Sequence, residues 1–349
     1  MLLPVLFCIL AAMMHCIMAI PSNMPVLTVT LSQVTNTRIK AEVKNTGAED
    51  LTIVHLNFFG DTAPIKKVSV FHNETELSFS GIKARLSFDN LTPDAVTTIP
   101  AGQILSDEFD LASTIDIAHS GDVTVYTSGF VPVTTDLQVT SYLPYYSNVL
   151  KMTVDAIKAS TIPKALSLLR ERTVVTSCTA EKKASMHTTL LAAVHLSLAA
   201  ANESYAGPAA RMEEYFKSSE KSVRDAVTNR YLLIASEASI EADGKTTIYC
   251  EDPYGVCTDH ILAYTWVDTN TVVSCPIFWR YLIPVNSWCH WQDQATTLIH
   301  EYAHCPAVCS PGTDDKAYGY NACRRLSTEE ALLNADTYAL FANAVYAKC

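Results

Sequence analysis

The distribution of cysteine divides this sequence into two parts. Cys8 and Cys16 lie in an apolar leader, and the next cysteine is Cys178. Nine then follow to the end of the chain: Cys178, Cys250, Cys257, Cys275, Cys289, Cys305, Cys309, Cys323 and Cys349. Such density after a secretory leader is typical of a disulfide framework formed in an oxidising compartment. Because nine is odd, at least one thiol is free, joined to another chain or bound to metal. The spacing alone fixes no pairing.

The leader itself, MLLPVLFCILAAMMHCIMAI, is apolar and contains no Lys or Arg. It predicts a signal peptide over residues 1–19, cleaved near Ala19, although the usual positive amino-terminal region is missing. An uncleaved membrane anchor is the alternative, since about 20 apolar residues can just span a bilayer. Pro4, His15 and the early position favour the signal. We therefore expect a secreted protein without stable membrane association, and the sequons at Asn73, Asn90 and Asn202 are compatible with a glycoprotein.

Short alternating runs follow the leader, among them VLTVTLSQV, RIKAEVKN and DLTIVHLNFF. Turn-forming segments such as NTGAED and FGDTAP separate them, so residues 25 to about 150 predict an all-β sandwich. The boundary lies in IPKALSLLRERTVVTSC, where the basic residues Arg170 and Arg172 offer a cleavage site to a processing protease. We expect a β-rich, sandwich-like propeptide over residues 20–172. An uncut linker between two domains is the alternative.

The cysteine-rich part has a different periodicity. EKKASMHTTLLAAVHLSLAAAN and SEKSVRDAVTNRYLLIASEAS carry apolar residues at helical spacing, and DQATTLIHEYAH predicts another helix. ILAYTWVDTNTVVSCPIFW predicts a strand–turn–strand unit. A last helix is expected to begin at the capping box Ser327–Glu330 and to continue through Tyr346. The chain is thus predicted to be multidomain. Its second unit, residues 173–349, is expected to be mainly α-helical, with a small β-hairpin region and several disulfides.

The net charge of this second unit limits the classes of molecule that it is expected to bind. After Arg172 the chain carries 13 basic and 20 acidic residues. An acidic surface argues against nucleic acid and favours basic protein substrates through electrostatic steering.

A metal-binding pattern occurs in IHEYAH. His300 and His304 are four residues apart, so on a helix both imidazoles project from one face. Glu301 is offset by about 100° and lies beside the metal rather than on it. This arrangement suits a water at the open position of a catalytic zinc, with Glu301 as its base. A solvated helix whose histidines merely share a face is the alternative.

The third ligand is left open by this pattern. Cys305–Pro306 should end the helix, and Pro311–Gly312 should turn the chain back beneath the metal. Cys309, Asp314 and Asp315 all follow closely enough to bind it. In an oxidised secreted domain a disulfide is the commoner fate of Cys309.

The downstream residues carry a family resemblance. Gly312-Thr313-x-Asp315-x-x-Tyr318-Gly319, shortly after His-Glu-x-x-His, resembles the deuterolysin pattern of the aspzincin zinc metalloendopeptidases, the neutral protease II-like enzymes. These are secreted fungal proteases made with a long propeptide. The resemblance covers the cysteine-rich part, including EDPYGVC and LSTEEALLNADTYALFANAVY, and extends more loosely over the β-rich part.

The resemblance implies a set of roles. His300, His304 and Asp315 would bind one zinc ion per chain, Glu301 would be the general base, and Tyr318 would donate a hydrogen bond to the oxyanion. It also implies the disulfides Cys178–Cys250, Cys257–Cys275 and Cys289–Cys349. Cys305, Cys309 and Cys323 are extra to the pattern, and two of them are expected to pair.

The role of one nearby residue stays open. Asp336 is either a partner that orients a ligand histidine or a structural hydrogen-bonding residue. His290 is interpreted as an ordinary turn or helix-start residue, and Tyr320 as a packing residue.

The leading hypothesis is therefore a secreted, monomeric zinc endopeptidase made as a zymogen, whose propeptide assists folding and blocks the cleft until it is removed. Basic protein substrates fit the resemblance and the charge. The alternative is a secreted binding or adhesion protein in which the β-sandwich is the working part. A third hypothesis is a different metal hydrolase that uses the same helix. It would require the match to Gly-Thr-x-Asp-x-x-Tyr-Gly to be a coincidence.

Overall fold

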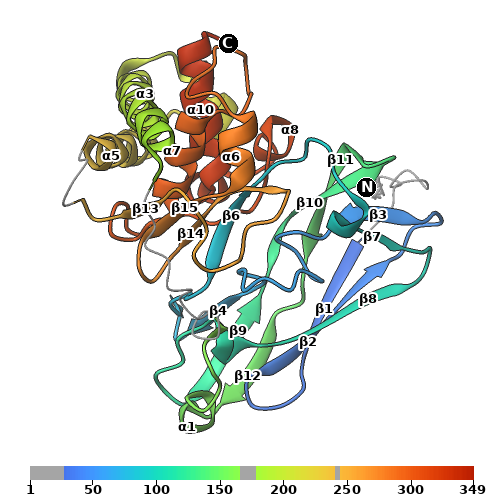
Figure 1. Ribbon diagram of the computed structural model, residues 1–349. Coiled ribbons are helices and arrows are strands. Elements are labelled where there is room, and N and C mark those ends of the chain that lie inside the picture. The colour runs from blue at the N-terminus through green and yellow to red at the C-terminus, as the bar shows by residue number, and fades with distance from the viewer. Residues whose placement is uncertain (1–26, 166–177, 240–243) are drawn as a thin grey trace, which may run out of the picture.

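A computed structural model describes residues 27–165, 178–239 and 244–349 (Figure 1). The expected signal peptide and the expected cut near Arg172 lie outside the described residues. Within them the chain is a mixed α/β protein: strands fill the first part, and helices with a further sheet make up the second.

The strands of the first part form three sheets, ordered β1-β2-β8, β11-β10-β3-β7 and β12-β9-β4-β5. Their bounds are β1 Leu27–Gln33, β2 Arg38–Asn45, β3 Leu51–Val54, β4 Ser69–His72, β5 Thr75–Glu76, β7 Val96–Ile99, β8 Ile104–Asp110, β9 Gly121–Tyr126, β10 Ser128–Thr135, β11 Gln138–Tyr146 and β12 Leu150–Val154. A short helix, α1 Ala156–Ala159, follows them. We call residues 27–165 the β-rich half.

Alternation explains why these segments are strands. In β1, Leu27, Val29 and Leu31 are buried while the residues between them are exposed, and β2 pairs with it antiparallel over its whole length. Side chains of successive residues point to opposite faces of a strand, so one face of each pair enters a core. That core collects residues from all three sheets, and Val70 and Val125 are completely buried in it.

The second part, residues 178–349, is called the cysteine-rich half. Its helices are α3 Ala180–Ala206, α4 Ala209–Phe216, α5 Lys221–Ala238, α6 Pro276–Tyr281, α7 Gln294–His304, α8 Tyr320–Cys323, α9 Thr328–Leu332 and α10 Ala335–Ala347. Its strands are β13 Thr247–Tyr249, β14 Ile261–Trp266 and β15 Thr271–Ser274. The expected hairpin is β14–β15, which is antiparallel. Helices α3, α5, α7 and α10 pack together above this sheet (Figure 1).

The prediction of one continuous last helix was wrong. The capping box at Ser327 and Glu330 is present, but it begins only α9. The chain leaves the helix at Leu333, and Asn334 is extended before α10 begins. The Asn334 side chain accepts hydrogen bonds from the backbone N–H groups of Lys316 and Ala317, at 2.8 and 3.0 Å, which holds the break in place. The break puts Asp336 in the first turn of α10.

Helix α3 is the one described helix long and apolar enough to cross a membrane by length and composition alone. Its buried residues include Ala193, Leu196 and Ala200, which belong to the core of the cysteine-rich half together with residues of α5, α7 and α10. Leu191 and Leu198 of the same helix are exposed, so packing in this core accounts for one part of its apolar composition.

Three disulfides join Cys178 to Cys250, Cys257 to Cys275 and Cys289 to Cys349, as the resemblance implies. These cross-links suit a protein that folds in an oxidising compartment. The expectation that two of the remaining three cysteines pair was wrong, because Cys305, Cys309 and Cys323 are all free and buried. Their sulfurs lie against different backbone carbonyls, those of Glu301, Arg230 and Ala317.

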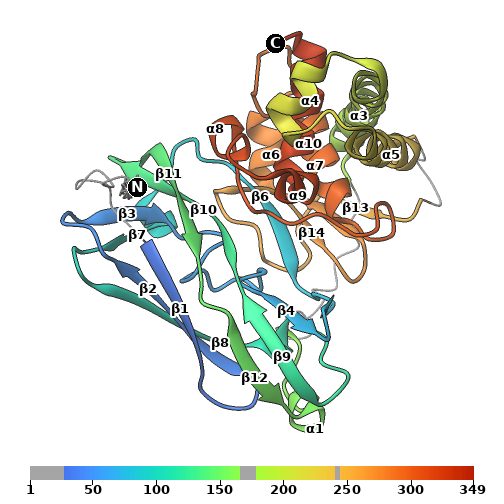
Figure 2. The same cartoon turned by 180° about the vertical axis from the view of Figure 1, so that it is seen from behind.

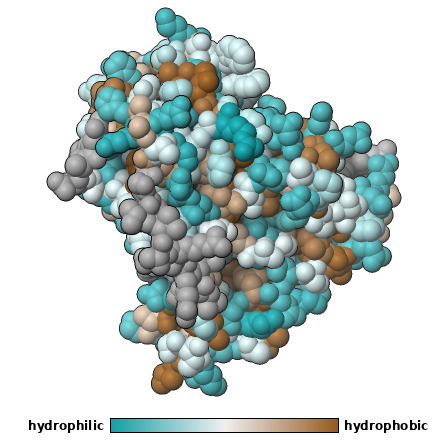
Figure 3. Space-filling model, in the orientation of Figure 1, coloured by the Kyte–Doolittle hydropathy of each residue, from teal (hydrophilic) through white to brown (hydrophobic). Residues whose placement is uncertain are grey.

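The two halves share one sheet. Strand β6, Ile82–Leu86 of the β-rich half, pairs antiparallel with β14, which completes the order β13-β15-β14-β6. Figure 1 shows β6 rising out of the β-rich half beneath the helices. From behind, β10 and β11 also reach the cysteine-rich half (Figure 2), where Phe130 N–H donates to the Lys316 carbonyl at 3.0 Å. On the face in Figure 3, small hydrophobic patches are scattered among hydrophilic residues over both halves.

Candidate metal centre

Helix α7 carries the two histidines and is completely buried. Its start is fixed by a capping box, in which the Asp293 carboxylate accepts the Thr296 N–H at 2.7 Å. Its last residue is His304, and Cys305 is the cap, as the following proline predicts. His300 and His304 therefore lie one turn apart on a rigid, buried support.

The loop after α7 returns to the helix. Thr313 N–H donates to the Ala303 carbonyl at 2.9 Å, and the Thr313 carbonyl lies 2.9 Å from Nδ1 of His304. Gly312 is required at this return, because a Cβ there would lie 2.3 Å from the His304 carbonyl oxygen. A hydrogen bond from Nδ1 leaves Nε2 of His304 with a free lone pair, which is the form that binds metals.

Asp315 completes a cluster that can hold a metal. Its Oδ1 lies 3.2 Å from Nε2 of His300, and its Oδ2 lies 3.3 Å from Nε2 of His304. The two Nε2 atoms are 3.1 Å apart. Ligands about 2.0–2.1 Å from a tetrahedral zinc are themselves roughly 3.3 Å apart, and two imidazoles with one carboxylate are a common zinc set. Both the spacing and the donor types fit zinc.

The two acidic groups at this site, Glu301 and Asp315, are both buried, but their pKa values shift in opposite directions. Burial raises the pKa of Glu301 to about 7, and neighbouring His304 only partly offsets this. For Asp315 burial also opposes ionisation, but His304 and His300 outweigh it and hold the pKa of the carboxyl below its usual range. Asp315 is therefore an anion beside two imidazoles, as a metal ligand must be.

Glu301 is positioned from the neighbouring strand. Thr265 of β14 donates from its hydroxyl to Oε2 of Glu301 at 2.7 Å. Among the described residues, Oε1 of Glu301 is buried without a hydrogen-bond partner. A carboxylate held by one oxygen keeps the other available for a proton.

Tyr318 and Asp336 flank the cluster on the side of the β-rich half. The Tyr318 ring lies nearly parallel to the His300 ring, with centroids 6.3 Å apart. Oδ1 of Asp336 is 3.5 Å from Nδ1 of His300, and its Oδ2 accepts the Gly319 N–H at 2.6 Å. Asp336 thus faces the outer nitrogen of a candidate ligand.

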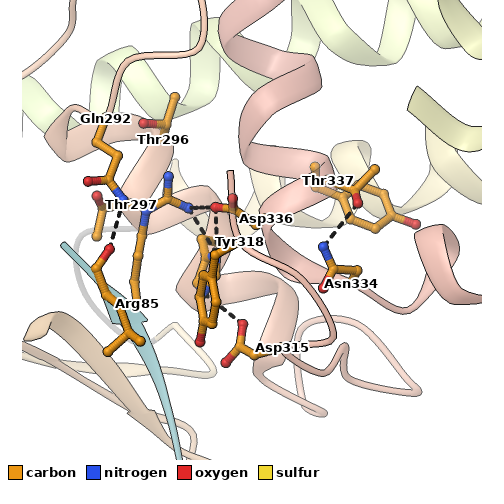
Figure 4. Close-up of polar contacts among 12 residues, drawn as sticks. Arg85, Gln292, Thr296, Thr297, Asp315, Tyr318, Asn334, Asp336 and Thr337 are labelled. Atoms are coloured by element: carbon orange, nitrogen blue, oxygen red, sulfur yellow. Dashed lines mark hydrogen bonds and ion pairs between the residues drawn. The ribbon is translucent and has the colours of Figure 1, made fainter. Parts of the chain in front are cut away.

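The sequence reasoning missed three cations that reach this site from the β-rich half. Arg85 of β6 places Nη1 2.7 Å from Oδ1 of Asp336 and 2.9 Å from Nδ1 of His300. Figure 4 shows the Arg85 side chain extending from β6 toward Asp336. Lys66 and Lys83 both lie within 2.9 Å of Asp314 carboxylate oxygens. Burial opposes the ionisation of Asp314, but the two lysines hold the pKa of that carboxyl far below its usual range.

The other residues weighed from the sequence lie outside the cluster. Asp314 points to the lysines rather than to the histidines. Cys309 is not part of the His300, His304 and Asp315 group. His290 lies in a turn, where its ring stacks on Tyr320 at 3.7 Å between centroids and its Nε2 lies 2.6 Å from the Tyr215 hydroxyl.

Comparison with known proteins agrees with this chemistry. The sequence pattern that defines the deuterolysin metalloprotease (M35) family matches this chain over residues 1–349. A neutral protease 2 homolog from Aspergillus fumigatus is 52% identical over 332 residues, which are 95% of this chain and 90% of the relative. Another from Aspergillus oryzae is 50% identical over 323 residues, 93% of this chain and 92% of the relative.

Among solved structures, a zinc peptidase from Grifola frondosa has 22% sequence identity and a TM-score of 0.39, and the match covers 48% of this chain and 97% of that one. At that level the likeness does not by itself define the fold.

Proposed function

Because the chain belongs to the deuterolysin metalloprotease (M35) family, and is therefore a zinc metalloendopeptidase acting on proteins, we propose that the cluster on α7 is its catalytic centre. His300, His304 and Asp315 would hold one zinc ion per chain. The observation that carries this proposal is the approach of three side chains from two segments: the two Nε2 atoms are 3.1 Å apart, and the two oxygens of Asp315 lie 3.2 and 3.3 Å from them, one on each.

Bound zinc would polarise the scissile carbonyl and make water a stronger acid. Glu301 would take the proton of the attacking water at Oε1 and later give it to the leaving amine. Thr265 would keep the other carboxylate oxygen in place. The Tyr318 hydroxyl would donate a hydrogen bond to the developing oxyanion, and Asp336 would orient His300 through Nδ1.

We further propose that the enzyme is secreted as a monomeric zymogen. Residues 1–19 would be a signal peptide, residues 20–172 a propeptide and residues 173–349 the mature enzyme, separated by a processing protease that cuts near Arg172. The three disulfides support an extracellular location, and the sequon residues Asn73, Asn90 and Asn202 are exposed. The excess of acidic residues in the cysteine-rich half, which would be the catalytic half and is called so below, supports a preference for basic protein substrates.

The test is protein hydrolysis and zinc content of the secreted, processed product for the native chain, Asp315→Ala and Glu301→Gln. We expect Asp315→Ala to lose both zinc and activity, and Glu301→Gln to keep zinc while activity falls at least about 100-fold. Ser236→Ala, near the carboxyl end of α5, is the control variant, and it should retain both zinc and activity. Native activity in the Glu301→Gln variant would show that Glu301 is not the general base.

A further inference from the structure

Asp314 directly precedes the candidate ligand Asp315, but its carboxylate faces two lysines of the β-rich half. Nζ of Lys66 lies 2.8 Å from Oδ2 and 2.9 Å from Oδ1 of Asp314. Nζ of Lys83 lies 2.9 Å from Oδ1 of Asp314 and donates to the Thr313 carbonyl at 2.5 Å. The side chains of Asp314 and of both lysines are at most 19% exposed. In the described part of the chain, the ion-pair partners of Asp314 thus come from the β-rich half.

The catalytic half alone fixes the position of these two acceptors. Asp314 N–H donates to the Leu333 carbonyl at 2.7 Å, and the Asp314 carbonyl accepts the Ala335 N–H at 3.0 Å. Thr313 N–H donates to the Ala303 carbonyl at 2.9 Å. Because these bonds lie within the catalytic half, the Thr313 carbonyl and the Asp314 carboxylate keep their places if the β-rich half is removed as proposed. Its removal leaves the carboxylate without either of the two lysines.

Lys83 shows where this carboxylate lies relative to a bound substrate. Lys83 belongs to β6 and pairs across from Thr265, the residue of β14 that holds Glu301. An extended peptide that binds the edge of a sheet gains affinity from main-chain hydrogen bonds and specificity from alternate side chains. A substrate that replaces β6 at the edge of β14, in the same direction, therefore directs one side chain to the place of the Lys83 ammonium.

Tyr318 relates this side chain to the cleaved bond. The Tyr318 hydroxyl donates to the Ala84 carbonyl oxygen at 2.6 Å, and Ala84 directly follows Lys83. Since the Tyr318 hydroxyl is the proposed donor to the oxyanion, a substrate residue in the place of Ala84 carries the carbonyl under attack. The residue in the place of Lys83 is then the second residue before the cleaved bond.

We infer that the Thr313 carbonyl and the Asp314 carboxylate form a subsite that binds a lysine or arginine side chain at the second residue before the cleaved bond. This inference rests on the proposed function, because it takes the β-rich half as a removable propeptide and Tyr318 as the oxyanion donor. Lysine repeats the contacts of Lys83. Arginine engages both carboxylate oxygens with two parallel N–H groups, since Lys66 no longer occupies them.

A peptide library tests this position in the substrate. The library is prepared from a cell extract with a glutamate-specific protease, so that lysine and arginine remain inside the peptides. The processed product of the full chain cuts the library, and mass spectrometry reads the residues on both sides of each new cut. We expect lysine and arginine to be enriched at the second residue before the cut.

A matched pair of synthetic peptides measures the size of the effect. The two peptides share one sequence cut in the library and differ only at this residue, which is lysine in one and norleucine in the other. Norleucine keeps the aliphatic chain and removes the charge. Because hydrogen bonds to charged groups are strong, kcat/KM should be at least about 10-fold higher for the lysine peptide.

Variants of Asp314 assign the preference to this residue. Asp314→Asn keeps the shape of the side chain and removes its charge, so the enrichment should disappear and the ratio of kcat/KM for the two peptides should approach one. Asp314→Glu keeps the charge and should retain a preference for lysine. Asp225→Asn, at a half-exposed carboxylate of α5, is the matched control and should keep the native ratio. Zinc content is measured for every variant, because Asp314 adjoins a candidate ligand.

The outcomes separate this inference from the proposed function. A processed product that cuts neither protein nor the library defeats the proposed function. Cuts without lysine or arginine enrichment at this position, or a peptide ratio near one for the native product, overturn the inference alone. It is also overturned if zinc-loaded Asp314→Asn keeps the preference, or if Asp314→Asn loses zinc and so shows a role in the metal site. A preference that is present in the native product and the Asp225→Asn control, and lost in zinc-loaded Asp314→Asn, supports the subsite.

Discussion

The ion pair between Arg85 and Asp336 should contribute strongly to the stability of the uncut chain. At 2.7 Å and an effective dielectric constant of about 20, two unit charges attract by roughly 6 kcal/mol. The cost of burying both charges offsets part of this, and removing one partner of a buried pair typically destabilises by about 3–5 kcal/mol. Asp336 keeps its hydrogen bond from Gly319 N–H, so we expect Arg85→Ala to lower the free energy of unfolding by about 3 kcal/mol.

A double-mutant cycle isolates the pair. The free energy of unfolding is measured in urea for the native uncut chain, Arg85→Ala, Asp336→Asn and the double variant, with a chelator present so that metal binding does not contribute. Tryptophan fluorescence is a suitable signal, because the four tryptophans, Trp266, Trp279, Trp288 and Trp291, all lie in the catalytic half. The coupling energy should be about 2 kcal/mol or more.

A surface pair provides the control. Arg38 and Glu108 lie 3.1 Å apart, but their side chains are 49% and 42% exposed. The cycle of Arg38→Ala and Glu108→Gln should therefore give at most about 1 kcal/mol. A coupling for Arg85 and Asp336 no larger than for this surface pair would refute the view that the buried pair joins the two halves.

Three further predictions concern the catalytic half. Tyr318→Phe should lower kcat by about 100-fold or more with little change in KM, if its hydroxyl acts only on the oxyanion, as steady-state kinetics of the processed product will show. Thr265→Val should lower kcat while zinc content is unchanged, because only the support of Glu301 is removed; a parallel loss of zinc would contradict this. Replacing both Cys257 and Cys275 by Ala opens a loop with a sequence separation of 18 residues and should reduce stability by about 3 kcal/mol, measurable by urea unfolding.

The elements that depend on local pattern could be predicted from the sequence. The helix with its two histidines ends where Pro306 requires, and Gly312 turns the chain back toward it. These are short-range relations, carried by spacing and by turn residues. That Asp315 rather than Asp314 or Cys309 meets the histidines was implied by the family resemblance and left open by the spacing. The prediction of one continuous last helix failed because the apolar period continues through Leu333, while the break depends on hydrogen bonds between Asn334 and a separate loop.

The contacts of β6 could not be predicted in this way. Within β6, Ile82, Ala84 and Leu86 alternate with Lys83 and Arg85, which is the pattern of a strand with one face in water. All five residues are buried, because the acidic groups of the catalytic half cover the charged face. A basic residue directed to solvent and one directed to a buried carboxylate look the same in a single sequence. Only the fold distinguishes them.

The completed sheet has a consequence for the lifetime of the active enzyme. While β6 is in place, β14 is an interior strand with a neighbour on each side. If the β-rich half is removed as proposed, β14 becomes an edge with unpaired backbone groups, and such edges readily join the edges of other molecules. The edge that would admit substrate would also promote self-association. We therefore expect the processed product, freed of β6, to lose solubility as its concentration rises, and saturating substrate to protect it.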